Sequence, residues 1–398
     1  MRAWLATRLP RPRPAAGRMT PEAAILLATV AVLLLLGLVM SFSASFVRST
    51  AETGDPFGIF RRQLVWALVG LVPLLLLARS EPQRWRRFAT PILLVALALS
   101  ALVLVPSIGL EAYGARRWLA LGPVTLQPSE LLKLAVPLYL AHLLARRWRR
   151  VRAGDLHALL MPAVPLLVIV AGLVLAEPDL ETSALLVGVG GLVLFTAGLP
   201  TRLLLLGGAG LGALGLVAIT QVEFRVGRVA AWLDPMADPA NLGYQSVQGF
   251  LALGSGGWLG TGLGQGRGKW LYLPNADTDF IFAIIGEELG LVGALATLLL
   301  YAALAVGGVR TARLAADPFG RLLAVGITGW LLMQATLNIG SVVGLLPVTG
   351  VTLPLVSVGG SSLVVTMAGV GALLAIARTT RTPPAVAEPT AHRDGAQR

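Results

Sequence analysis

The run AAILLATVAVLLLLGLVMSFSASFV occupies residues 23–47 and contains no charged residue between Glu22 and Arg48. A helix needs about 20 apolar residues to cross the hydrocarbon core of a bilayer. The run is longer than the apolar region of a secretory signal peptide, which spans about 7 to 15 residues. It therefore predicts a membrane-spanning helix that is retained in the protein.

Segments of the same kind follow along the chain. Of its 398 residues, 56% are hydrophobic and only 13% are charged, which leaves too few polar side chains to cover a soluble globule. The sequence predicts an all-α, polytopic membrane protein with about ten transmembrane helices. After the first span, the others fall at about 62–79, 87–111, 128–145, 155–177, 181–202, 202–223 and 288–310, with two more between 321 and 378.

The distribution of Lys and Arg predicts the orientation of these spans. With a cytoplasmic N-terminus, 22 of the 32 basic residues fall in inside segments and nine in outside loops, as the positive-inside rule requires. Both termini are then cytoplasmic. The predicted organisation is an Arg/Pro-rich tail (1–21), a membrane domain (22–378) with one large external loop (about 221–278), and a second cytoplasmic tail (379–398). The localisation is a cytoplasmic membrane with any active site facing outward.

Composition also excludes several functional classes. Cysteine is absent, which excludes disulfides, thiol catalysis and thiolate metal sites. There are only three histidines, which argues against a His-rich metal site. The net charge is +12, but the basic residues form short clusters between apolar runs, as orientation signals and contacts to anionic lipids do. The chain carries no nucleic-acid-binding motif, so we expect no nucleic-acid partner.

One candidate polar site lies within a predicted span. The segment from Gln127 to Glu130 reads as a helix start with proline in the first turn, and Lys133 follows three residues later on the same face. The two charges either cap the helix and neutralise each other or face a cavity, as ionisable groups inside membranes usually do.

A second cluster runs from Pro274 to Phe282 and continues into a Gly-Glu-Glu-Leu-Gly segment at 286–290. Asp277 or Thr278 is expected to cap the helix, which leaves Asp279 in its first turn at the outer membrane boundary. Along a helix, Asp279 and Glu287 would lie about 12 Å apart, too far for a pair of catalytic carboxylates. Asp279 is therefore predicted to be a lone carboxylate whose partners come from other segments.

Cations in the outside loops break the inside bias, so orientation does not explain them. They suit a phosphate or pyrophosphate, although surface ion pairs with the loop acids are an alternative. The set comprises Arg116, Arg117, Arg225, Arg228, Arg267 and Lys269.

Two segments rich in small residues complete the candidate features. The glycine-rich run at 254–266 lacks a Walker ending; it either brings backbone amides to a ligand or forms a re-entrant turn. The run SVGGSS, residues 357–362, opens the last span. Small residues there favour helix packing over a nucleophile site.

Together these segments resemble the SEDS family of bacterial cell-wall polymerases, which contains FtsW, RodA and SpoVE. The matching segments occur in the family's order over residues 22–378 and are specific as a set. The form of 285–288 and the run at 232–235 look more like the division branch than the elongation branch. The matching runs are GARRW (114–118), QPSE (127–130) with Lys133, EPDL (177–180), GYQ (243–245), the glycines from 256 to 264, 273–282, GEELG (286–290) and 353–362.

The resemblance implies a ten-span glycosyltransferase that polymerises lipid II outside the cytoplasmic membrane, at the division septum. Its implied partners are a class B penicillin-binding transpeptidase and other membrane proteins of the division machinery. Asp279 matches the family's essential aspartate, and Trp118 is implied to matter for activity. The residues assigned to substrate binding are Trp118, Glu130, Lys133, Arg116, Arg117, Arg225, Arg228, Lys269, Glu287 and Ser361.

The chain departs from the family pattern at several positions near these runs. The family His is Asp277 here, and the usual Gln before Pro178 is Glu177. Further departures are Asn275 for Glu, Glu181 for Gly and Val358 for Tyr.

The chemistry of the implied reaction fits these residue types. Transfer of a sugar from a diphospholipid needs a base for the acceptor hydroxyl and cations for the departing pyrophosphate. Asp279 would supply the base, and the outside arginines, with or without a divalent metal (Mg²⁺ or Mn²⁺), would hold the pyrophosphate. Two other functions stay open at this stage, a flippase or transporter for lipid-linked precursors and a non-catalytic division scaffold.

Overall fold

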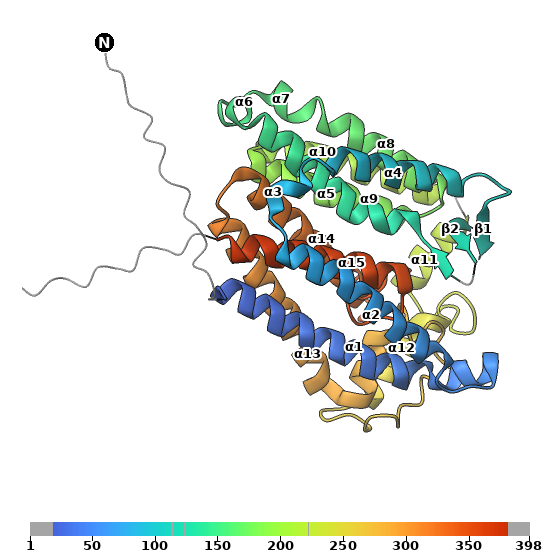
Figure 1. Ribbon diagram of the computed structural model, residues 1–398. Coiled ribbons are helices and arrows are strands. Elements are labelled where there is room, and N and C mark those ends of the chain that lie inside the picture. Colours follow the sequence, from blue (N-terminus) through green and yellow to red (C-terminus); the bar gives the residue numbers. More distant parts are fainter. Residues whose placement is uncertain (1–18, 113–114, 123, 222, 381–398) are drawn as a thin grey trace, which may run out of the picture.

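The computed structural model describes residues 19–112, 115–122, 124–221 and 223–380. Most of both predicted tails lies outside these residues. The long helices pack side by side in one bundle, and the strands gather at the end away from the start of α1 (Figure 1). The main helices are α1 (Pro21–Thr53), α2 (Gly58–Arg79), α4 (Ala89–Val103), α5 (Pro128–Arg146), α8 (Ala163–Ala176), α9 (Leu180–Ala197), α10 (Thr201–Thr220), α13 (Ile281–Leu314), α14 (Pro318–Val342) and α15 (Gly360–Arg378). Shorter helices are α3 (Pro82–Trp85), α6 (Trp148–Arg152), α7 (Leu156–Leu160), α11 (Glu223–Leu233) and α12 (Tyr244–Ser255).

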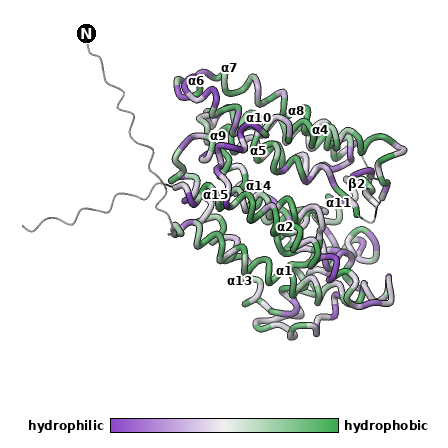
Figure 2. Tube along the Cα trace, viewed as in Figure 1, coloured by the Kyte–Doolittle hydropathy of each residue, from purple (hydrophilic) through white to green (hydrophobic). Residues whose placement is uncertain are grey.

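Each predicted span contains one of these helices, and the chain is a polytopic membrane protein. Within the described residues, seven helical segments are long and apolar enough to cross a membrane. Ala89–Val103 and Thr201–Val217 are apolar but shorter, and α5 carries the charged residues Glu130 and Lys133. The total of ten spans therefore stays a prediction. Figure 2 shows hydrophobic residues along the lengths of the helices and hydrophilic ones gathered mainly towards their ends.

The prediction of a purely helical chain misses one small sheet. Strands β1 (Gly109–Ala112), β2 (Ala115–Leu121) and β3 (Val124–Leu126) form an antiparallel sheet in the order β1-β2-β3. Leu110 pairs with Trp118 across the first two strands. Gly122 makes the turn into β3 with a φ of 65°, a conformation that favours glycine. The sheet fixes the positions of Arg117 and Trp118, which lie within β2.

The glycine-rich run crosses α13 where that helix is kinked. Gly290 has a φ of 68° inside α13, and a Cβ atom there would lie 2.3 Å from the backbone nitrogen of Gly260. A Cβ on Gly260 would lie 2.1 Å from the carbonyl oxygen of Glu288. Only glycine permits this approach of two backbones, so the run forms a fixed crossing rather than a span.

The two ends of the described chain meet at one end of the bundle. Thr20 Oγ1, at the N-cap of α1, donates to the carbonyl of Ala377 near the end of α15 over 2.9 Å. Beside it, Arg310 of α13 pairs with Glu22 at 2.9 Å. This adjacency is what an even number of spans requires.

The predicted orientation can be tested because the chain contains no cysteine. Met236, in the loop after α11, is 68% exposed, and Arg149 of α6 is also exposed. We expect Met236→Cys to react with a membrane-impermeant thiol reagent in intact cells and Arg149→Cys to react only after permeabilisation. The opposite pattern would reverse the assigned sides.

Candidate functional site

A cavity of about 1410 Å³ opens among the ends of several helices and the small sheet. Its walls come from the end of α1, the start of α2, strands β2 and β3, the start of α5, the helix α11, the turn before α13 and the start of α15. The volume is large enough for more than one sugar-sized group. The charged residues that line it are Arg48, Asp55, Arg61, Arg62, Arg117, Glu130, Lys133, Asp179, Arg228 and Asp279.

Asp279 lines this cavity from the turn that precedes α13. Asn338 Nδ2 of α14 donates to the backbone carbonyl of Asp279 over 2.8 Å, which fixes the turn. Burial, followed by the nearby charge of Asp277, raises the pKa of Asp279 to about 7. Arg228 opposes this shift, as Arg117 does to a smaller extent. A carboxyl group with a pKa near the working pH suits a general base.

Glu130 and Lys133 form the ion pair that their spacing predicts. Lys133 Nζ lies 2.7 Å from Glu130 Oε1, and both side chains are almost fully buried. Lys133 also donates to Gln334 Oε1 of α14 over 3.2 Å. Both residues line the cavity, so the pair neutralises itself and also faces a polar space.

Two of the predicted outer arginines reach the cavity. Arg117 donates through Nε to the carbonyl of Glu177 over 3.2 Å. Arg228 of α11 pairs with Glu181 of α9 at 3.0 Å and also lines the cavity. These contacts hold each guanidinium in place, and both groups contribute positive charge near Asp279.

Other members of the predicted set lie elsewhere or outside the description. Arg116 pairs with Glu111 across β1 and β2 at 2.9 Å and is not among the cavity residues. Arg225 belongs to α11, but its side chain lies outside the described residues. Trp118 and Ser361 do line the cavity, and Ser361 Oγ accepts from the backbone N–H of Gln127 at 3.5 Å.

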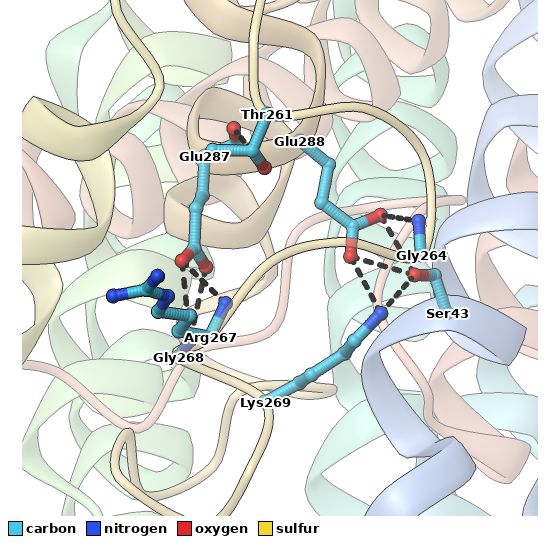
Figure 3. Close-up of polar contacts among 8 residues, drawn as sticks. All are labelled: Ser43, Thr261, Gly264, Arg267, Gly268, Lys269, Glu287 and Glu288. Atoms are coloured by element: carbon cyan, nitrogen blue, oxygen red, sulfur yellow. Dashed lines mark hydrogen bonds and ion pairs between the residues drawn. The ribbon is translucent and has the colours of Figure 1, made fainter.

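Lys269 and Glu287 are held in a different cluster, which Figure 3 shows. Lys269 Nζ pairs with Glu288 Oε1 at 2.8 Å and donates to Ser43 Oγ over 3.2 Å. Glu287 accepts from the backbone amides of Arg267 and Gly268 at 2.6 and 3.1 Å. Neither Lys269 nor Glu287 lines the cavity. The structure thus does not bring these two predicted substrate-binding residues to the cavity, because each is held by other parts of the chain.

The same cluster explains the glycine-rich run. A backbone amide of this run does meet an anion, but the anion is a carboxylate of α13. Gly264 N–H donates to Glu288 Oε2 over 3.0 Å. The amides of Thr261 and Gly262 donate to the carbonyls of Glu287 and Glu288. The run is therefore bound to α13 by hydrogen bonds.

Asp277 does not cap α13, contrary to the sequence-based expectation. The N-cap residue is Phe280, with no side-chain cap, and α13 begins at Ile281. Asp277 is 2% exposed and accepts from Arg48 of α1 at 3.1 Å. Its backbone carbonyl accepts from the N–H of Val358 over 2.9 Å. Asp277 thus joins three separated segments.

Three cavity arginines were absent from the predicted site, namely Arg48 at the end of α1 and Arg61 and Arg62 at the start of α2. A signal for them exists, because they are the other three of the nine basic residues in outside loops. All nine are exceptions to the inside excess of basic residues, so all nine could have been predicted as candidate phosphate-binding cations.

Glu177 departs from the family's glutamine, and its environment accounts for the difference. The residue is completely buried at the turn between α8 and α9. Burial, with Asp179 nearby, raises the pKa of Glu177 to about 8. Near pH 7 the carboxyl group is therefore mostly protonated, and a protonated carboxyl resembles an amide in shape and charge.

The described residues contain no group of three or more His, Asp or Glu side chains that could hold a metal ion. Among these residues, any Mg²⁺ or Mn²⁺ would therefore have fewer than three such side chains as ligands.

Comparisons with known proteins find a matching family model and several relatives. A model of the FtsW, RodA and SpoVE family, described as "Cell cycle protein", matches residues 23–382. "Probable peptidoglycan glycosyltransferase FtsW" of Mycobacterium tuberculosis is 45% identical over 378 residues, which cover 95% of this chain and 71% of that protein.

Solved structures give the same result. The rod shape determining protein RodA of Thermus thermophilus is 33% identical, with a TM-score of 0.65, over 90% of this chain and 97% of its own. A chain described under "Structural coordination of polymerization and crosslinking by a peptidoglycan synthase complex" is 34% identical, with a TM-score of 0.72. That match covers 89% of this chain and 96% of the solved one.

Proposed function

This chain belongs to the FtsW, RodA and SpoVE family and is a peptidoglycan glycosyltransferase, and we propose that it joins lipid II units in the cavity with Asp279 as the base. The single observation that carries the proposal is a carboxylate with a pKa of about 7 in a cavity lined by arginines. A base and an array of cations are the two groups that sugar transfer from a diphospholipid requires.

The proposed reaction exchanges one bond for another. The acceptor hydroxyl oxygen attacks the anomeric carbon of the donor sugar, and the bond from that carbon to the diphosphate breaks. The hydroxyl proton passes to Asp279, and the bonding electrons leave with the lipid diphosphate. Arg117 and Arg228 lie on the β2 and α11 side of the cavity, and Arg61 and Arg62 lie on the α2 side. Guanidinium groups bind phosphate oxygens well, so these residues would hold the departing diphosphate.

We also propose a place for a divalent ion, namely on the substrate. Because the described residues offer no metal cluster, Mg²⁺ or Mn²⁺ would arrive bound to the substrate diphosphate. It would add positive charge there.

The pH dependence of the reaction tests the role of Asp279. Only the deprotonated carboxylate accepts a proton, so activity should rise with pH and reach half its plateau near pH 7. We expect this rise, the acidic limb of the pH profile, when purified protein polymerises lipid II in buffers from pH 5 to 9. The rate of glycan formation is followed by separating the products on gels. A rate that is flat from pH 5 to 9 would contradict a base with this pKa.

The partners and the cellular site are also part of the proposal. A class B penicillin-binding transpeptidase is the proposed main partner. A related solved chain belongs to a complex that its description connects with polymerization and crosslinking, which supports this choice. We further propose lipid II as the substrate, the outer face of the membrane as the site of reaction, and the division septum, with other division proteins, as the location. The FtsW name of the relatives supports the last of these.

A transporter would use the buried charges differently. Transport of a lipid-linked precursor would depend on ionisable residues within the membrane, such as Glu130, Lys133 and Glu287. Glu287 is bound to the backbone amides of residues 267 and 268 and is absent from the cavity lining. The three residues therefore do not form one path, which favours polymerisation.

A further inference from the structure

Arg48 has a contact that the proposed mechanism does not use. Its guanidinium Nη1 lies 3.1 Å from Asp277 Oδ1 and 3.4 Å from Oδ2, and its Nε lies 2.7 Å from Glu52 Oε1. The Arg48 side chain is 40% exposed, whereas that of Asp277 is 3% exposed. Arg48 lines the cavity and Asp277 does not, so of this pair only Arg48 faces the cavity.

The turn that carries Asp279 is held through its backbone at each of its three residues. The carbonyl of Asp277 accepts from Val358 N–H, and the carbonyl of Thr278 accepts from Ser357 Oγ over 2.6 Å. The carbonyl of Asp279 accepts from Asn338 Nδ2. The Arg48 ion pair adds a side-chain tie to a fourth segment, α1.

The charge of Asp277 matters to its neighbour. After burial, the negative charge of Asp277 is the largest cause that raises the pKa of Asp279. Burial raises the pKa of Asp277 itself, and Arg48 opposes that rise. The other charged groups that act on Asp279 are Arg228 on α11, Glu181 on α9 and Arg117 on β2. Arg48 therefore acts on Asp279 through Asp277.

We infer that Arg48 is a positioning residue for Asp279: its ion pair with Asp277 fixes the 277–279 turn and keeps Asp277 ionised beside the reacting carboxylate. The inference rests on the proposed role of Asp279 and extends it to a residue of α1. It also explains a departure of this chain, because Asp277 stands where the family pattern has histidine. An aspartate at that position needs a counter-charge, and Arg48 supplies it.

The test compares how the polymerisation rate rises with pH on the acidic side (the acidic limb) in four proteins: wild type, Arg48→Gln, Asp277→Asn and the double variant. In Arg48→Gln the charge that opposes burial is lost, so the pKa of Asp277 rises and Asp277 keeps its proton to higher pH. Asp279 then has less negative charge beside it, and we expect the limb to move about one pH unit to the acidic side, with activity at pH 6 several-fold higher relative to that at pH 9. Asp277→Asn removes the same charge outright and should move the limb in the same direction.

The double variant separates charge from mere scaffolding. It lacks both charges, so its limb should coincide with that of Asp277→Asn, because Arg48 acts on Asp279 through Asp277. Arg48→Lys should keep most of the wild-type profile. Glu52→Gln removes the exposed partner of Arg48 but keeps the pair with Asp277, so its limb should match the wild type closely.

Two results would overturn the inference. One is an Arg48→Gln protein whose rate falls by the same factor at every pH and is not recovered in the double variant. The other is an unmoved limb in both Arg48→Gln and Asp277→Asn. Should Arg48→Gln fail to fold, the double variant decides: a limb that differs from that of Asp277→Asn would show that Arg48 acts by another route than Asp277 and would overturn the inference. A wild-type protein that makes no glycan at any pH would refute the proposed function instead, so the two failures are distinguishable.

Discussion

Replacement of Asp279 by asparagine should reduce lipid II polymerisation by about 10²- to 10⁴-fold, the usual contribution of a positioned base. Asparagine is nearly the same size as aspartate but cannot accept the proton. The backbone bond from Asn338 to residue 279 does not involve the side chain, so the turn should keep its position. The measurement is the initial rate of glycan formation by purified protein at pH 8, together with its thermal unfolding midpoint.

Asp277→Asn is the matched control for this substitution. It makes the same chemical change two residues away, in a side chain that does not line the cavity. At pH 8, where Asp279 is mostly ionised in both proteins, we expect at most a few-fold loss. Equal losses in the two variants would mean that the effect comes from the turn and not from the base. An Asp279→Asn protein with a normal rate would remove the assignment.

Lys133→Met should give the largest loss of stability. It leaves Glu130 without its partner in a site where both side chains are almost fully buried. Breaking a buried ion pair by removing one partner typically costs about 3 to 5 kcal/mol, because an uncompensated charge stays behind. The double variant with Glu130→Gln removes both charges and should recover much of this loss. Thermal unfolding in detergent, read by intrinsic fluorescence, would measure both.

An exposed pair with the same spacing provides the comparison. Glu81 and Arg84 are also three residues apart, but their side chains are 71% and 65% exposed. Water already screens such a pair, so Arg84→Gln should change the unfolding midpoint far less than Lys133→Met. Similar shifts for the two variants would show that burial is not what makes the Glu130–Lys133 pair important.

The helices were predictable because charged residues mark where each apolar run ends. Glu22 and Arg48 bracket the first run, and α1 extends only a few residues past them. The sheet at 109–126 was not predictable in the same way. Its longest strand reads ARRWLAL and does not alternate between apolar and polar residues, and the other two contain only four and three residues.

The site was predictable only where one segment carries the information. The pair of Glu130 and Lys133 follows from helical spacing. Arg48 and Asp277 are separated by 229 positions, and no local pattern indicates that they meet. Lys269 was misplaced for the same reason. Its sequence context shows a cation in an outer loop, whereas its burial depends on how that loop folds against α13.

The central claim is that the cavity polymerises lipid II, and one measurement on proteoliposomes addresses it directly. Purified wild-type chain is reconstituted with lipid II, with and without a class B transpeptidase, and glycan length and lipid II sidedness are recorded in the same sample. The account predicts long glycan strands in wild type and almost none in Asp279→Asn. Movement of lipid II across the bilayer without any glycan from the wild-type protein would contradict it and identify a transporter.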